Sequence, residues 1–109
     1  MDDKVKRYLV DISEAILHIE AFTVAIDSLE SYEKNLLVKR AVERELEIIG
    51  EAMSRVLKMD ESIPIESARR IVDLRNRVIH GYDKADDSVI WGILKKYVPL
   101  LKAEVEAVF

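Results

Sequence analysis

Residues 73–82 bring together an arginine, an asparagine, a histidine and a tyrosine: Arg75, Asn76, His80 and Tyr82. An arginine guanidinium offers five fixed donors and a permanent charge to a phosphate, and a histidine moves a proton near neutral pH. An asparagine can orient the imidazole. These groups are sufficient for metal-free cleavage of RNA, because RNA supplies its own nucleophile, the 2′-hydroxyl. The stretch therefore predicts phosphate chemistry at Arg75 and His80, supported by Asn76.

The spacing of these residues constrains how they can act. On one helix Asn76 and His80 share a face, whereas Arg75 and His80 point roughly 140° apart. Either the helix tightens or ends near His80, as Gly81 suggests, or a second copy of the chain faces the first across a two-fold axis. A dimer also supplies a second histidine, so that one acts as base and the other as acid. We therefore expect a homodimer.

Hydrophobic periodicity indicates the elements that must position this stretch. Apolar residues recur at steps of three and four, which predicts amphipathic helices over residues 5–29, 34–59 and 64–80, and a fourth from an Asp86 cap to Phe109. A turn is expected at 30–33, Pro64 begins the third helix, and Pro99 is expected to kink the fourth. No window alternates as a strand does. The prediction is an all-α antiparallel four-helix bundle forming one domain, 1–109.

Composition narrows the class of protein. The chain has 109 residues, half of them apolar, and no cysteine, so neither a disulfide framework nor a thiolate metal site is expected. The sequence shows no signal peptide and no apolar run long enough to span a membrane, which favours the cytoplasm. The net charge is −4, yet residues 66–84 hold five basic side chains against three acidic ones. That local excess suits a phosphate-bearing partner, but on charge alone a solvated, ion-paired helix face is the better explanation.

The motif Arg-Asn-x-x-x-His-Gly-Tyr at 75–82 resembles the signature of HEPN domains, specifically the HepT toxins. Residues 40–52 and 86–91 resemble the same subfamily, so the resemblance covers nearly the whole chain. It implies a metal-independent RNA endonuclease without a cofactor, acting as a homodimer, with Arg75 and His80 catalytic and Asn76 supporting them. It also implies a partner, a minimal nucleotidyltransferase antitoxin similar to MntA, that neutralises the toxin by AMPylating the motif tyrosine, Tyr82.

Simpler interpretations stand beside this one. Arg75 and His80 are also what a helix C-terminus favours electrostatically, and tyrosines such as Tyr82 often pack at the end of a bundle. The chain can also be a noncatalytic helical HEPN module that positions substrate for a partner nucleotidyltransferase, or a plain dimerisation domain. His18 is expected at the surface or at an interface. Glu43 and Glu47 are expected to be surface charges of a helix and not metal ligands, because no Glu-x-x-His pair completes a metal site.

Overall fold

The computed structural model describes residues 2–67, 69–73 and 87–109. Every element in these ranges is helical, which confirms the all-α prediction. The elements are α1 (Asp3–Phe22), α2 (Leu29–Lys34), α3 (Leu36–Met59), α5 (Asp87–Gly92), the π-helix η1 (Ile93–Tyr97) and α6 (Val98–Val108). Residues 69–73 are also helical and precede α5 in the chain. None of the helices in the described part is long and apolar enough to cross a membrane.

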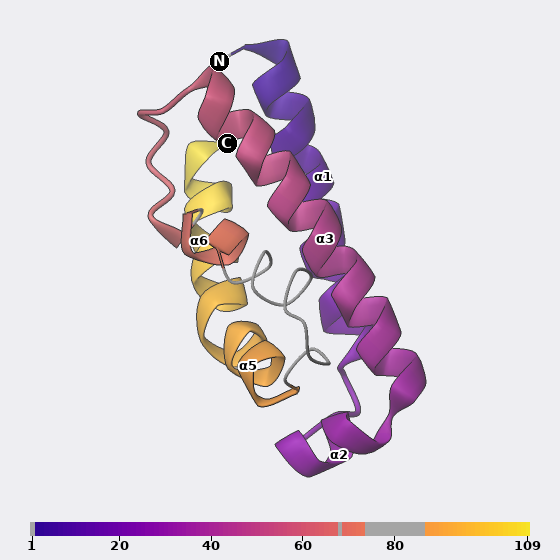
Figure 1. Ribbon diagram of the computed structural model, residues 1–109. Coiled ribbons are helices and arrows are strands. Elements are labelled where there is room, and N and C mark those ends of the chain that lie inside the picture. The colour runs from indigo at the N-terminus through magenta and orange to yellow at the C-terminus, as the bar shows by residue number, and fades with distance from the viewer. Residues whose placement is uncertain (1, 68, 74–86) are drawn as a thin grey trace.

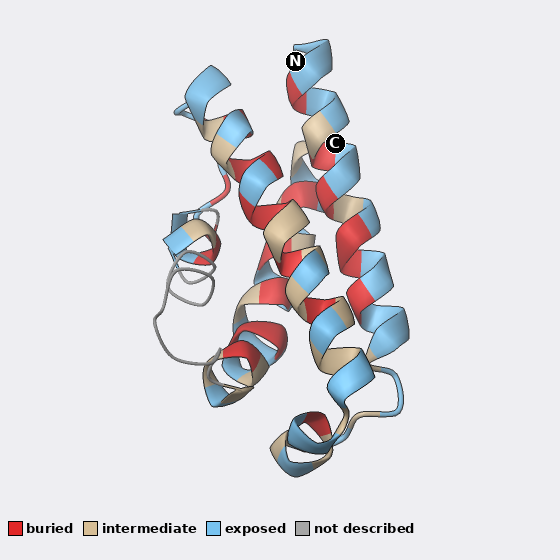
Figure 2. Cartoon of the chain, turned by 45° about the vertical axis from the view of Figure 1, so that its right-hand side comes forward, coloured by how far each residue is buried: buried red, intermediate tan, exposed pale blue. Residues whose placement is uncertain are grey.

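The two longest helices, α1 and α3, run antiparallel and side by side, and the α5–η1–α6 segment packs alongside them (Figure 1). Each contributes one buried apolar stripe, and the stripes face one another (Figure 2). The stripes comprise Val5, Leu9, Ile12, Ile16 and Ile19 of α1, Val42, Leu46, Ile49, Met53 and Val56 of α3, and Val98, Leu101 and Val105 of α6. This is the packing that the three-to-four residue period predicts.

The predicted helix over residues 5–29 is wrong at its C-terminal end. α1 stops at Phe22, where the Thr23 hydroxyl and backbone N–H both donate to the Ile19 carbonyl. The chain then begins α2 at the Ser28 cap, whose side chain accepts from the backbone N–H of Ser31 at 3.1 Å. The turn predicted at 30–33 therefore lies inside a short helix, because a serine pair forms a capping box there.

The predicted second helix is confirmed at its end and shifted at its start. α3 begins at Leu36, since the Asn35 side chain accepts from the Val38 N–H at 3.0 Å and acts as the N-cap. It ends at Met59, as predicted.

The irregularity expected at Pro99 takes the form of a π-helical turn just before it. Pro99 has no N–H to donate one turn back, and the Val98 N–H bonds to the Ile93 carbonyl, five residues earlier. The wider turn rotates the side chains that follow relative to a regular helix. It therefore decides which faces Lys95, Lys96 and Tyr97 occupy.

Candidate functional site

The predicted site residues Arg75, Asn76, His80 and Tyr82 lie outside the described residues, as do the expected caps at Gly81 and Asp86. Their roles remain predictions. The structure does describe both flanks of this stretch, namely residues 69–73 before it and α5 after it. These flanks are the described residues nearest to the motif in the chain.

The flank before the motif is fixed by a carboxylate from the last helix. Glu104 of α6 accepts from the backbone N–H groups of Glu66 and Ser67 and from the Ser67 hydroxyl. The Ser67 N–H to Glu104 Oε1 distance is 3.2 Å, and Ser67 is buried. A carboxylate at the first turn of a helix satisfies donors that have no partner within the helix and is favoured by the helix dipole. Glu104 thus caps the helical residues that lead toward Arg75.

The flank after the motif is held by an ion pair. Asp87, the first residue of α5, lies 2.8 Å from the ammonium nitrogen of Lys39 in α3. Both side chains are only about one-fifth exposed (18% for Lys39 and 21% for Asp87), so solvent screens this pair less than it screens one at the surface. The pair fastens the start of α5 to the scaffold helix.

Tyr32 of α2 packs against the same helix, α5. Its ring is fully buried and meets the Trp91 ring of α5 at 5.7 Å between centroids. Burial raises the pKa of the Tyr32 phenol above its ordinary value, and the negative charges of Glu43 and Asp87 add to this. The hydroxyl has no hydrogen-bond partner among the described residues. Tyr32 therefore stays neutral and acts as an apolar wedge between α2 and α5.

Cations and aromatic rings meet where residues 69–73 face η1. The Arg70 guanidinium donates to the Tyr97 hydroxyl at 3.2 Å and lies 5.4 Å from the centre of the same ring. On η1, Lys96 lies over the Tyr97 ring and Lys95 over the Trp91 ring. Trp91 is half-buried and packs against the edge of the core.

A groove lies beside the helical residues that precede the motif. It is lined by Ser54, Leu57, Lys58 and Glu61 near the end of α3, and by Arg69, Val72 and Asp73. The lining mixes two basic with two acidic side chains, so it has no strong preference for an anion.

The remaining candidates behave as surface residues. The His18 side chain is 57% exposed, and its Nδ1 lies 3.2 Å from Glu45 Oε1 of α3, which confirms it as a surface histidine. Glu43 and Glu47 pair with Arg40 and Arg44, three residues before them. Within the described ranges, no cluster of three or more potential metal ligands occurs.

Comparisons with known proteins agree with the family resemblance of the sequence. The family of HepT-like ribonucleases matches residues 12–108. The chain belongs to this family. A protein of Methanocaldococcus jannaschii, named provisionally as an RNase, is 42% identical over 106 residues, covering 95% of each chain. A protein of Thermococcus cleftensis, named provisionally as a ribonuclease HepT, is 37% identical over 105 residues, covering 93% of this chain and 92% of its own.

A solved structure confirms the HEPN fold for this HepT-like chain. It is described as the tri-AMPylated HEPN toxin of Shewanella oneidensis in complex with MNT antitoxin. The two chains superpose with a TM-score of 0.72 at 12% identity, over 99% of this chain and 98% of the other. The fold predicted from periodicity and motif is therefore correct.

Sequence reasoning found the motif of this HepT-like protein but missed its anchors. Glu104 and Lys39 lie on the polar faces of amphipathic helices and look like ordinary surface charges. Glu104 contacts a residue 37 positions away. No local pattern signals such a pairing.

Proposed function

We propose that this chain is a metal-independent RNA endonuclease, the toxin of a toxin–antitoxin pair. The observation that carries the proposal is the complete Arg75, Asn76, His80 and Tyr82 motif in a chain of the HepT-like ribonuclease family. The relatives that are named as RNases support it. The noncatalytic alternative has no need of both Arg75 and His80.

In the proposed reaction, the 2′-oxygen of the RNA attacks the adjacent phosphorus and the bond to the 5′-oxygen breaks. His80 takes the proton of the 2′-hydroxyl, and Arg75 stabilises the negative charge that develops on the phosphorane. Asn76 orients the imidazole. A homodimer supplies a second His80, which protonates the leaving 5′-oxygen. The products are a 2′,3′-cyclic phosphate and a 5′-hydroxyl.

We further propose that a minimal nucleotidyltransferase similar to MntA switches the enzyme off at Tyr82. The tyrosine oxygen attacks the α-phosphorus of ATP, its proton passes to a base of the partner enzyme, and pyrophosphate leaves. The resulting phosphodiester carries a negative charge and an adenosine, which oppose the entry of RNA by repulsion and by occupancy. The solved neighbour is an AMPylated toxin with its MNT antitoxin, which supports a partner of this kind.

Cleavage of a labelled RNA in the presence of EDTA tests the catalytic proposal. His80→Ala is expected to lower the rate by about 10²–10⁴-fold, the usual contribution of general acid–base catalysis. Arg75→Ala is expected to be comparably slow, and Arg75→Lys to restore little, since a lysine lacks the guanidinium fork. Circular dichroism checks that each variant stays folded. Full activity in His80→Ala, or strict dependence on a divalent metal, overturns the mechanism.

Two further readouts test the dimer and the switch. A mixture of Arg75→Ala and His80→Ala chains is expected to recover part of the activity if each site uses both subunits. Light scattering that finds only monomer during full cleavage contradicts the dimer. Intact mass after incubation with the partner and ATP is expected to rise by about 329 Da per AMP unit in wild type and not in Tyr82→Phe. Equal modification of both chains removes Tyr82 from the proposal.

A further inference from the structure

Five side chains on η1, α5 and the helical residues before the motif form what we name the cation–ring strip: Arg70, Trp91, Lys95, Lys96 and Tyr97. The Lys95 ammonium lies 4.6 Å from the centre of the Trp91 ring, and the Lys96 ammonium lies 5.5 Å from that of Tyr97. The Arg70 guanidinium lies over the same tyrosine ring at 5.4 Å. Each positive group of the strip therefore lies over an aromatic ring.

The cations of the strip have no acidic partner among the residues that the structure describes. None of Arg70, Lys95 and Lys96 has a carboxylate within ion-pair distance in the part of the chain that the structure describes. All three are exposed, and the two rings are half-buried. A ring held by the core is a rigid platform, whereas an exposed lysine over it can swing aside at little cost. The strip thus presents free positive charge next to fixed aromatic surfaces.

We propose that the cation–ring strip binds single-stranded RNA, with phosphates on the three cations and bases stacked on Trp91 and Tyr97. Single-strand binding sites combine positive charge that follows the backbone with aromatic rings that stack bases. Arginine, tryptophan and tyrosine are enriched in protein–protein interfaces as well, but lysine is depleted there, and lysines carry two of the three positive charges of the strip, which favours phosphates over a protein partner. This inference rests on the proposed ribonuclease function, to which it adds a substrate-binding surface distinct from Arg75 and His80.

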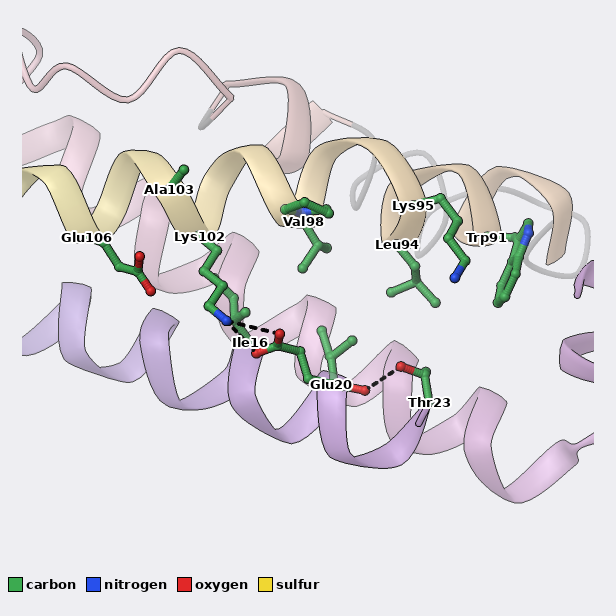
Figure 3. Close-up of a pocket in the computed structure, with 12 residues that line it drawn as sticks. Ile16, Glu20, Thr23, Trp91, Leu94, Lys95, Val98, Lys102, Ala103 and Glu106 are labelled. Carbon is green, nitrogen blue, oxygen red and sulfur yellow. Dashed lines mark hydrogen bonds and ion pairs between the residues drawn. The ribbon is translucent and has the colours of Figure 1, made fainter. Parts of the chain in front are cut away.

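A groove between α1 and the η1–α6 segment borders the strip at Trp91 and Lys95. Trp91 and Lys95 lie at one end of this groove, beside the apolar side chains of Leu94 and Val98, which project toward α1 from the same segment (Figure 3). Farther along, Lys102 pairs with Glu20 of α1 at 3.0 Å.

The Glu20–Lys102 pair neutralises Lys102, so the free positive charge does not continue along the groove toward α6. The other two cations of the strip, Lys96 and Arg70, both lie over the Tyr97 ring, and Arg70 lies five residues before Arg75 in the sequence. A strand that binds both rings would therefore reach the described residues that precede the motif in the chain.

Fluorescence anisotropy with a labelled single-stranded RNA tests the charge component, with every protein carrying His80→Ala to prevent cleavage. Lys95→Ala/Lys96→Ala is expected to weaken binding at least tenfold at low salt. It should also flatten the slope of log affinity against log salt by about 1.4, since each phosphate contact on single strands contributes about 0.7. Lys4→Ala/Lys6→Ala is the matched control. It removes two exposed lysines without described ion pairs from the start of α1, and it is expected to change affinity less than threefold.

Substitutions at Tyr97 test the stacking component. Tyr97→Leu keeps apolar bulk and loses the ring, and it is expected to weaken binding roughly 5- to 150-fold, the range for one stacked base. Tyr97→Phe keeps the ring and loses only the hydrogen bond from Arg70, and it should remain within about threefold of the parent. Thermal melts of both variants verify folding. Equal affinity of Tyr97→Leu and the parent overturns the stacking role.

The outcomes separate this inference from the proposed function. If the strip variants bind RNA as the parent does, with the same salt slope, the strip is not an RNA surface, even where wild type cleaves RNA normally. If wild type binds RNA through the strip but never cleaves it, the ribonuclease proposal fails and the binding surface stands. If RNA affinity is unchanged and co-elution with the nucleotidyltransferase is lost, the strip is a protein interface and the inference is wrong.

Discussion

The α1–α3 pair and the region around the motif are stabilised in different ways. In α1 and α3, regular helices bury continuous apolar stripes, and exposed arginines find partners close by in sequence. Arg40, Arg44 and Arg55 each pair with a glutamate three or four residues away. Around the motif, the contacts join residues far apart in the chain, as Ser67 does with Glu104 and Asp87 with Lys39.

We call the α1–α3 pair the scaffold, and we call the Ser67–Glu104 and Lys39–Asp87 contacts on either side of the motif the frame. Local ion pairs on an exposed helix contribute little to stability, so the scaffold depends on its apolar core. The frame depends on a few polar contacts that each fix one end of the motif segment, while the cations of the strip keep their charge available. Substitutions in the scaffold and in the frame are therefore expected to differ in their effects on stability and on activity.

The largest effect is expected in the scaffold. Ile49 is fully buried between α1 and α3. Ile49→Ala should lower the free energy of unfolding by about 2–5 kcal/mol, because it removes buried methyl groups and leaves a cavity. Urea titration followed by circular dichroism measures this. A loss below about 1 kcal/mol would show that the core does not carry the scaffold.

A smaller effect is expected in the frame. Glu104→Ala removes the acceptor of three donors, one of them the buried Ser67 hydroxyl, and should cost about 1–3 kcal/mol. Glu104→Gln keeps one oxygen acceptor and should cost less. Because Glu104 positions the segment before Arg75, the alanine variant should also lose cleavage rate at temperatures where it remains folded. Unchanged stability and cleavage rate in Glu104→Ala would show that Glu104 does not position the residues before Arg75.

Tyr32 gives a prediction in which pH decides the result. Burial, followed by Glu43 and Asp87, raises the pKa of the Tyr32 phenol above its ordinary value, while Arg40 opposes the rise. The unfolded chain releases the phenol proton near pH 10, and the folded chain retains it. This group's contribution to stability is therefore complete below pH 10 and declines above it, by up to about 1.4 kcal/mol per pH unit.

Tyr32→Phe removes both the titration and a buried hydroxyl without a described partner. At pH 7 its stability should equal or exceed that of wild type by up to about 1 kcal/mol. Above pH 10 the variant should lose less stability than wild type, so its advantage in melting temperature should grow across thermal melts at pH 9, 10 and 11. If the two proteins lose stability in parallel across this range, the phenol ionises normally in the folded state.

The smallest effect is expected at the local ion pairs. Arg44 is 69% exposed and lies 3.2 Å from Glu47. Arg44→Ala should change the free energy of unfolding by less than about 0.5 kcal/mol, since solvent and salt screen such pairs. A change above about 1 kcal/mol in the same urea titration would mean that the outer face of α3 has a structural role beyond this pair.

Much of the fold follows from patterns within a few residues of each position. The period of apolar residues correctly predicted the helices, and the polar run that leads to Pro64 correctly predicted the end of α3 at Met59. It misplaced the end of α1, because the period continues through Ile26 and Leu29 while the serine cap at Ser28 starts a new helix. Apolar spacing reports which face is buried, and capping decides where a helix stops.

The sequence by itself determined the helical class, the family and the motif that carries the proposed chemistry, because each is written in residue types at short, fixed spacings. Tertiary structure alone decided which acceptor caps Ser67, which cation holds Asp87, and which rings lie under Lys95 and Lys96. The first two pairings join residues distant in the chain, and the third depends on a π-helical turn that shifts the faces of the helix. Such contacts depend on how helices pack, and a pattern confined to one helix does not contain that information.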